Sequence, residues 1–246
     1  MSRSIAVSLT FILIFGILFP LLAAESVDVE KGFTPLFNGK DLTGWTVKCK
    51  PQDKDKSFWK VADGAIVCDS IGRKDHDYVW LMTDKEFGEF ELSLKFQAFK
   101  DSRGNSGVQV RSRYDESVGW LDGPQVDIHP PVPWRTGLIY DETRGERRWI
   151  HPSLKSSTIA SSHAPKQWKF KLAGEEDGWN GLTIICRGLR IKTILNGLVM
   201  SDYDGAGVLD NAAHQTRKVG VTGHIALQLH THDELRIRFN EIKIRD

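Results

Sequence analysis

Apolar and polar residues alternate with a period of two along most of this chain. The clearest case is residues 90–97, where every second residue is apolar, a pattern that predicts a strand with one buried face. Further strands are expected at residues 43–49, 65–69, 79–82, 108–113, 125–129, 168–172, 182–187, 189–195, 225–230 and 235–244. After the N-terminal segment, helical periodicity never lasts more than a turn or two. The pattern therefore predicts an all-β fold, an antiparallel β-sandwich.

Turn residues separate these segments. Asp63-Gly64 and Asn196-Gly197 predict tight hairpins, because Asp, Asn and Gly tolerate the positive backbone angles that such turns need. In the last predicted strand the apolar register shifts by one residue at Asn240-Glu241, which predicts a β-bulge. Residues 130–162 are poor in strand signals and rich in Pro, Arg and Trp, so we expect a long loop system over one edge or face of the sandwich.

The N-terminal segment differs from the rest. It carries only Arg3 as a charged residue before an uncharged run from Ile5 to Ala24. With small residues at its end, the segment 1–24 is typical of a secretory signal peptide, although its length also suits an uncleaved membrane anchor. We expect a periplasmic or secreted protein in which residues 32–246 form a single domain.

Charge and cysteine content narrow the class of protein. The formal net charge is +1 at pH 7, and removal of Arg3 would leave basic and acidic side chains in equal number. Because both signs are interspersed, nucleic acid and anionic membranes are not expected as main partners. The 3 cysteines allow at most one internal disulfide, for which Cys49 and Cys68 are the expected pair, while Cys186 is expected to be a buried thiol.

Polar residues occupy alternate positions on three of the predicted strands. In chain order these are Gln109 and Arg111, then Gln125, Asp127 and His129, and finally Gln228 and His230. The residues between them are apolar, so each strand turns its polar side chains to the same face. We expect one sheet face and one pocket to be shared by Gln109 or Arg111 and by Gln125, Asp127, Gln228 and His230.

The segment Gln125-x-Asp127-x-His129 invites comparison with jelly-roll glucanases, whose catalytic strand carries Glu-x-Asp-x-x-Glu. Retaining glycosidases need a nucleophilic carboxylate and a second carboxyl group as acid. Here Gln125 stands at the first Glu position and Pro130 at the last. The two-carboxylate route of a glucanase is therefore not expected on this strand.

The sequence resembles a known family over residues 33–245. The resemblance is carried by LFNGKDLTGW at 36–45, NSGVQVRSR at 105–113, GPQVDIHP at 123–130, TGLIY at 136–140, Trp179-Asn180 and IALQLH at 225–230. In this order they are similar to the 3-keto-disaccharide hydrolase domain, also described as 3-keto-glucoside 1,2-lyase/3-keto-2-hydroxy-glucal hydratase. The resemblance implies a concanavalin-A-like jelly roll that acts on an oxidised (3-keto) glycoside.

The chemistry that the resemblance implies is an elimination followed by hydration. A ketone at C3 of the sugar acidifies the C2 proton, a base removes it, the substituent at C1 leaves, and water then adds. This chemistry asks for a base, an electrophile for the enolate oxygen and an acid for the leaving group. The catalytic candidates are Asp127, His230, Arg111 and Tyr140. The substrate-binding candidates are Asn105, Gln109, Gln125, Gln228, His129 and Trp134.

Several alternatives stay open at this point. Arg111 could bind the sugar, or form an ion pair with Asp127, or both; Asn105 could be a turn residue. The charged and aromatic loop between Trp134 and His151 either holds a sugar ring or is a solvated loop fixed by ion pairs. A divalent metal held by Asp127, His129 and His230 could polarise the ketone. The rival function is a non-catalytic carbohydrate-binding jelly-roll module of the cell envelope.

Overall fold

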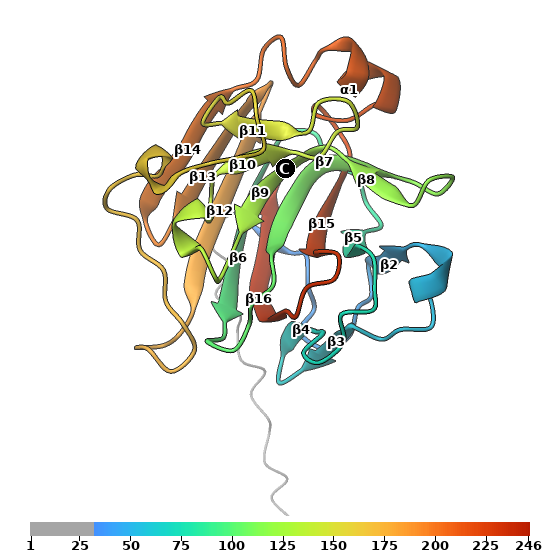
Figure 1. Cartoon of the computed structure of the whole chain (residues 1–246), viewed down its shortest axis with the longest axis vertical. Helices are drawn as coiled ribbons and strands as arrows, with labels where there is room; N and C mark the ends of the chain where they lie inside the picture. Colours follow the sequence, from blue (N-terminus) through green and yellow to red (C-terminus); the bar gives the residue numbers. More distant parts are fainter. Residues whose placement is uncertain (1–31) are drawn as a thin grey trace, which may run out of the picture.

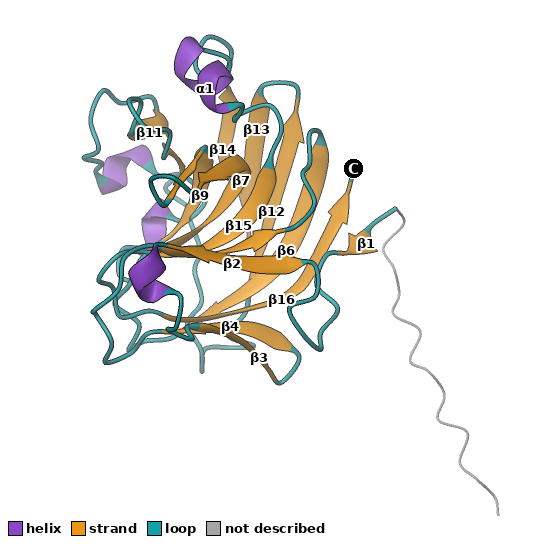
Figure 2. Cartoon of the chain, turned by 90° about the vertical axis from the view of Figure 1, so that its right-hand side faces the viewer, coloured by secondary structure: helices purple, strands orange, loops and turns teal. Residues whose placement is uncertain are grey.

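The computed structural model describes residues 32–246, and these residues fold into two antiparallel sheets of eight strands each (Figures 1 and 2). Sheet A contains β1 (Thr34–Pro35), β3 (Trp59–Ala62), β4 (Ala65–Asp69), β6 (Phe90–Ala98), β12 (Asn180–Arg187), β13 (Arg190–Leu195), β14 (Leu198–Asp204) and β16 (Arg236–Arg245). Sheet B contains β2 (Trp45–Cys49), β5 (Val79–Thr83), β7 (Ser106–Asp115), β8 (Trp120–Asp122), β9 (Pro124–Ile128), β10 (Ile139–Asp141), β11 (Arg148–His151) and β15 (His224–Leu229). The helical elements are α1 (Ala212–Arg217) and the short 3-10 turns Pro51–Asp53, Pro133–Arg135 and Ser161–His163.

Strand order shows how the chain crosses between the sheets. Sheet A runs β14-β13-β12-β6-β16-β4-β3 with β1 on β16, and sheet B runs β11-β10-β9-β7-β15-β5-β2 with β8 on β7. Chain neighbours such as β15 and β16 therefore lie in different sheets. This is the crossing pattern of a jelly-roll sandwich, and it confirms the predicted fold class.

The core lies between the two sheets and follows from the period-two pattern. On β6 the alternate residues Phe90, Leu92, Leu94 and Phe96 are buried, and the residues between them are not. Val108 and Val126 on sheet B face the same core. Apolar faces of two sheets exclude water most fully when they pack on each other, so the alternation fixes which side of each strand faces outward.

Most of the predicted strands and turns are confirmed. Asp63-Gly64 joins β3 to β4 and Asn196-Gly197 joins β13 to β14, with all four residues at positive φ. The register of β16 against β6 shifts between Asn240 and Lys243, which is the predicted bulge.

Two predictions about secondary structure are wrong. Residues 168–172 form no strand, because the Lys171 N–H and carbonyl bond to the Asn180 side chain instead of to a strand ladder. The segment 130–162 is not only loop, since β10 and β11 extend sheet B beyond β9. These strands are short and carry charged residues at their ends, so their period was too brief to recognise.

The expected disulfide is also wrong. Cys49, Cys68 and Cys186 are all free and buried. Cys49 ends β2 in sheet B, whereas Cys68 lies on β4 in sheet A, and each thiol packs into the core as a small apolar group. Burial raises the pKa of the Cys186 thiol to about 12.

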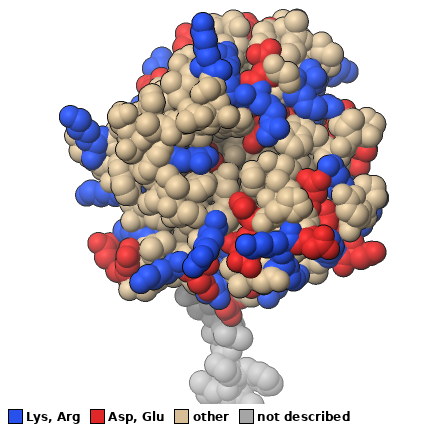
Figure 3. Space-filling model, viewed as in Figure 1, with Lys and Arg blue, Asp and Glu red and all other residues tan. Residues whose placement is uncertain are grey.

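The segment 1–24, expected to be a signal peptide, lies outside the described residues. Within residues 32–246, none of the helices has the length and apolar character that crossing a membrane requires. On the face shown in Figure 3, basic and acidic side chains are interspersed.

Candidate functional site

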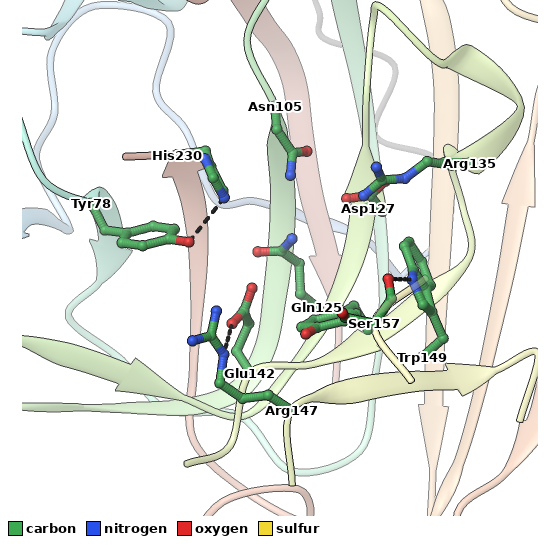
Figure 4. Close-up of a pocket in the computed structure, with 11 residues that line it drawn as sticks. Tyr78, Asn105, Gln125, Asp127, Arg135, Glu142, Arg147, Trp149, Ser157 and His230 are labelled. Carbon is green, nitrogen blue, oxygen red and sulfur yellow. Dashed lines mark hydrogen bonds and ion pairs between the residues drawn. The ribbon is translucent and has the colours of Figure 1, made fainter. Parts of the chain in front are cut away.

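A pocket opens on the outer face of sheet B, away from the core. Its cavity volume is about 160 Å³, and Figure 4 shows its polar side chains converging from several elements. The lining residues are Tyr78, Asn105, Gln125, Asp127, Arg135, Tyr140, Glu142, Arg147, Trp149, Ser157 and His230. Strand β9 supplies the floor, and the walls come from β10, from β11 and from segments that precede or follow strands.

The floor is formed by β9. Val126 and Ile128 point into the core, so Gln125 and Asp127 between them point outward into the pocket. In the neighbouring strand β7, Gly107 lies opposite Asp127. A Cβ atom at Gly107 would lie 2.5 Å from Cδ of Gln125, so only glycine leaves room for this glutamine.

The first carboxyl group of the pocket is Asp127. Its side chain is 1% exposed and pairs with Arg135, whose Nε lies 3.0 Å from Oδ2. Burial raises the pKa of Asp127 to about 6, although Arg135 acts in the opposite direction. Asp127 is thus ionised at neutral pH but is a stronger base than an ordinary aspartate.

The second carboxyl group is Glu142, which directly follows β10. Burial raises its pKa to about 7, while Arg147, with Nε 3.4 Å from Oε2, favours the ionised form. The Arg147 guanidinium lies 4.8 Å from the ring centroid of Trp120, a cation–π contact that holds it over the pocket wall. At neutral pH Glu142 therefore exists in both protonation states.

The third group is the pair Tyr78 and His230. Tyr78 precedes β5 and His230 follows β15, and these strands are neighbours in sheet B. The Tyr78 hydroxyl lies 2.9 Å from Nε2 of His230. Figure 4 shows this pair on one side of the pocket and Asp127 with Arg135 on the other.

Aromatic rings form another wall. Tyr140 and Trp149 meet edge to face with centroids 5.3 Å apart, and the Arg135 guanidinium lies 4.9 Å from the Trp149 ring. The Trp149 Nε1–H donates to the Ser157 carbonyl at 2.8 Å, which ties the following loop to the pocket. Flat apolar surfaces beside polar groups suit the two faces of a sugar ring.

The structure brings together five of the candidate residues predicted from sequence. They are Asn105, Gln125, Asp127, Tyr140 and His230, and all of them line the pocket. Asp127 and His230 belong to segments of the same sheet, as expected from the shared polar face.

Arg111 lies elsewhere, and its expected place in the pocket is wrong. Its φ of 50° and the register shift between β15 and β7 at this position break the alternation, so the side chain leaves the polar face. The buried guanidinium donates to the carbonyls of Gly88 at 2.8 Å, Gly188 at 2.6 Å and Gly220 at 3.3 Å. Arg111 therefore fastens three chain segments, and Asp127 pairs with Arg135 instead.

Gln109 and Gln228 lie on the expected face of sheet B but do not line the pocket. Gln109 is covered by β8, where its Nε2 donates to the Leu121 carbonyl at 3.1 Å. Gln228 lies opposite Trp80 in the register of β15 and β5, and it is fully buried. Larger neighbours cover both glutamines, which the alternation alone does not reveal.

His129 and Trp134 also fall outside the pocket lining. The Nδ1 atom of His129 accepts the Val132 N–H at 3.0 Å, and burial lowers the pKa of this histidine to about 4. The candidate metal ligands Asp127, His129 and His230 are thus not assembled as a set. Among residues 32–246 no group of three or more His, Cys, Asp or Glu side chains is arranged to hold a metal ion.

Sequence reasoning missed three lining residues altogether: Tyr78, Arg135 and Ser157. A signal existed for Tyr78, because Tyr78, Trp80 and Met82 alternate with the core residues Val79 and Leu81. Arg135 and Ser157 come from loops without a periodic pattern, so the sequence carried no signal for either residue. Glu142, Arg147 and Trp149 belong to the charged aromatic loop, which does contribute to the pocket.

Solved structures share this fold. Two proteins from Parabacteroides distasonis, proposed to be glycosyl hydrolases, align with TM-scores of 0.55 and 0.53 at 18% and 24% identity. The alignments cover 87% of this chain in both cases, and 94% and 98% of those chains. A Bacillus subtilis protein of unknown function with a galectin-like fold aligns with a TM-score of 0.50 at 11% identity, over 87% of this chain and 94% of that one. At these identities the likeness establishes the fold alone.

Comparison with sequence families goes further. No curated protein matches the sequence. The profile of the 3-keto-alpha-glucoside-1,2-lyase-like domain matches residues 32–245, which is nearly all of the described chain and confirms the family suggested by the sequence motifs. The protein is thus carbohydrate-related, and it belongs to the 3-keto-alpha-glucoside-1,2-lyase-like domain family.

Proposed function

We propose that this protein cleaves 3-keto-glycosides by removing the C2 proton, expelling the C1 substituent and then adding water. The observation that carries the proposal is the pairing of two buried carboxyl groups of raised pKa, Asp127 and Glu142, each with an arginine in one pocket. Groups whose pKa values lie near neutrality are suited to proton transfer, and they concentrate at active sites. Family membership supports the same chemistry.

Asp127 is proposed as the base. A C2 proton beside a C3 ketone is acidic because the resulting charge moves onto the ketone oxygen. Burial makes Asp127 more basic, and Arg135 keeps it ionised at neutral pH. An unoxidised glucoside offers no such acidic proton, so it should not react.

Arg147 and Glu142 are proposed to receive the charge that develops on the C3 oxygen. Arg147 donates as a cation, and the fraction of Glu142 that is protonated at neutral pH can donate an O–H. A neutral carboxylic acid in a buried site is an established device for stabilising an enolate. The remaining step is protonation of the leaving oxygen, and Tyr78 and His230 form the pocket wall to which no role has yet been given.

The size of the pocket fits a single sugar ring. A closed cavity of about 150 Å³ holds benzene, a six-membered ring without hydroxyl groups, and this open pocket measures about 160 Å³, so it has room for one ring whose substituents reach toward the mouth. We propose that the oxidised ring occupies the pocket while its C1 substituent extends through the mouth. We propose that an oxidoreductase supplies the ketone beforehand, because an unoxidised glucoside has no acidic proton at C2.

The test is incubation of the purified protein with a panel of 3-keto-glucosides and their parent glucosides, with release of the aglycone measured by chromatography. Cleavage of the oxidised forms alone is expected. Equal cleavage of parent glucosides would point to ordinary glycoside hydrolysis. Saturable binding of sugars with no cleavage of any substrate would point to the rival function, a carbohydrate-binding module.

A further inference from the structure

A chain of hydrogen-bonding groups leads from the pocket wall to a carboxylate behind it. The Tyr78 hydroxyl lies 2.9 Å from Nε2 of His230, and Nδ1 of the same ring lies 3.3 Å from Oδ2 of Asp233. The Asp233 carboxylate also accepts the Asn105 N–H at 2.7 Å. Burial opposes its charge, yet the hydrogen bonds from His230 and Asn105 hold the pKa of Asp233 below its ordinary value.

The acceptors around Nδ1 fix where the histidine carries its protons. Nδ1 faces the Asp233 carboxylate and, at 3.2 Å, the Thr231 carbonyl, and both groups can only accept. Nδ1 must therefore carry a hydrogen in every protonation state. Nε2 alone gains or loses a proton, and its partner is the Tyr78 hydroxyl.

This arrangement couples the state of His230 to what Tyr78 offers a ligand. When Nε2 is bare, the tyrosine O–H donates to it, and the oxygen offers only a lone pair, which can accept from Arg147 or from a ligand. When Nε2 carries a hydrogen, it donates to the tyrosine oxygen and the O–H is free to donate into the pocket. A carboxylate, an imidazole and a hydroxyl in series form the general pattern of an activated proton-transfer group.

Tyr78 is held rigidly enough for this task. Its ring stacks on Trp80 with centroids 5.4 Å apart and an interplanar angle of 9°, and it meets the Trp120 ring edge to face with centroids 5.0 Å apart. Its hydroxyl reaches the pocket although the residue is only 8% exposed. The charged and titratable groups facing His230 are Asp233 on its own turn, Asp127 and His129 on the β9 side, and Glu142 after β10.

We propose that Tyr78 is a catalytic residue that delivers the proton of His230 to the leaving oxygen, and that Asp233 is the positioning residue of this relay. The inference rests on the proposed function and deepens it, because it names the group that the elimination still needs. It also assigns a task to Nε2 of His230, which lies against the Tyr78 hydroxyl at the pocket wall.

The proton balance closes over the full cycle. In the elimination, Asp127 takes the C2 proton, the C1–O bond breaks, Tyr78 gives its proton to the departing oxygen, and Nε2 of His230 gives its proton to Tyr78. In the hydration, water bonds to C1 and gives a proton to Tyr78, whose own proton returns to Nε2. Asp127 loses the abstracted proton to solvent while the C1 substituent departs, takes up a proton from water, and gives that proton to C2, so the protein ends in its starting state.

Leaving groups of different acidity test this role. Phenoxides with strongly electron-withdrawing groups depart without a proton, whereas a methoxide does not. In Tyr78→Phe we expect kcat for methyl 3-ketoglucoside to fall about a hundredfold, the usual scale for a lost general acid. For the 4-nitrophenyl compound, kcat should fall by no more than about threefold after the spontaneous rate is subtracted. Tyr114→Phe is the matched control, since Tyr114 also packs on Trp80, with centroids 5.8 Å apart, but does not line the pocket.

Hydrogen exchange separates this proposal from the proposed function itself. In D2O, Tyr78→Phe should still place deuterium at C2 of the unreacted methyl 3-ketoglucoside, because Asp127 still removes the proton. This exchange also shows that the variant is folded. Wild-type protein that neither exchanges C2 nor cleaves any 3-keto-glucoside would contradict the proposed function, and the relay with it.

Three results for Tyr78→Phe would overturn the relay: an equal fall in kcat on both compounds, loss of deuterium exchange at C2, or no fall in kcat on either compound. Asp233→Asn gives an independent reading. The Asp233 carboxylate is an acceptor that orients the Nδ1–H of His230, so kcat for the methyl compound should fall at least about tenfold, while kcat for the 4-nitrophenyl compound stays within about threefold and KM within about twofold. Equal losses of kcat on both compounds, or a change in KM alone, would contradict the role of Asp233.

Discussion

Replacing Asp127 by Asn should abolish cleavage and at the same time stabilise the fold at neutral pH. The carboxyl group is 1% exposed, and burial raises its pKa from 3.8 to about 6. The folded protein therefore holds a proton between pH 4 and pH 6 that the unfolded chain releases. Stability falls with rising pH wherever the folded state binds more protons, so the ionised Asp127 destabilises the wild-type protein above about pH 6.

The magnitude follows from the pKa rise. A rise of one in pKa corresponds to about 1.4 kcal/mol, so a rise from 3.8 to about 6 corresponds to about 3 kcal/mol. Asn removes this cost but also the pairing with Arg135, so about 1–3 kcal/mol is expected above pH 7. At pH 4 most of the advantage of Asn should be gone, and it should vanish well below the ordinary pKa of 3.8, where Asp127 is protonated in both states.

Urea unfolding of wild type and Asp127→Asn at pH 4, 6 and 8 measures this difference, and Asp202→Asn is the control, because Asp202 lies in an exposed pair with Arg190. Activity should fall in parallel: the wild-type rate should decline below about pH 6 as Asp127 is protonated, and the variant should lose at least about a hundredfold at all pH values. A variant that is less stable than wild type at pH 8, or a stability difference that does not change with pH, would refute the reasoning.

Three further changes test other parts of the site. Gly107→Ala should raise KM at least about tenfold, because the new Cβ would lie 2.5 Å from Cδ of Gln125 and displace it; steady-state kinetics with an unchanged melting temperature would check this. Arg135→Gln should move the acid limb of the pH–rate profile up by about one pH unit, since the guanidinium no longer favours ionised Asp127; an unmoved limb would contradict the pairing. Arg111→Met should destabilise the fold by about 3 kcal/mol or more in urea, because three carbonyls in different chain segments, among them the buried carbonyl of Gly220, lose their donor. A fall in kcat without loss of stability would instead place Arg111 in the site.

Strand periodicity predicted the parts of the site that depend only on which face a residue takes. Gln125 and Asp127 alternate with Val126 and Ile128, and His230 continues the outward face of β15, so their convergence on sheet B was foreseen. Arg111 has the same apparent period, but one positive φ turns it toward three glycine carbonyls. A single backbone angle of this kind leaves no trace in the spacing of apolar residues.

The remaining errors arise from tertiary packing. Nothing local indicated that β8 would cover Gln109, or that the loop after β9 would bring Arg135 back to Asp127. Burial by distant segments also raises the pKa values of Asp127 and Glu142, and the residues around them in the sequence do not reveal this burial. The residue types of the pocket were therefore more predictable than the distances and charge states that give them a function.

The most direct test of the central claim follows deuterium during cleavage in D2O. A 3-keto-glucoside has two protons beside its ketone, at C2 and at C4, and only loss of the C2 proton leads to elimination. Nuclear magnetic resonance of the released keto sugar, timed against an enzyme-free sample, should show deuterium at C2 and hydrogen at C4. A product with hydrogen at C2, or with equal label at both carbons, would contradict enzymatic abstraction of the C2 proton by this pocket.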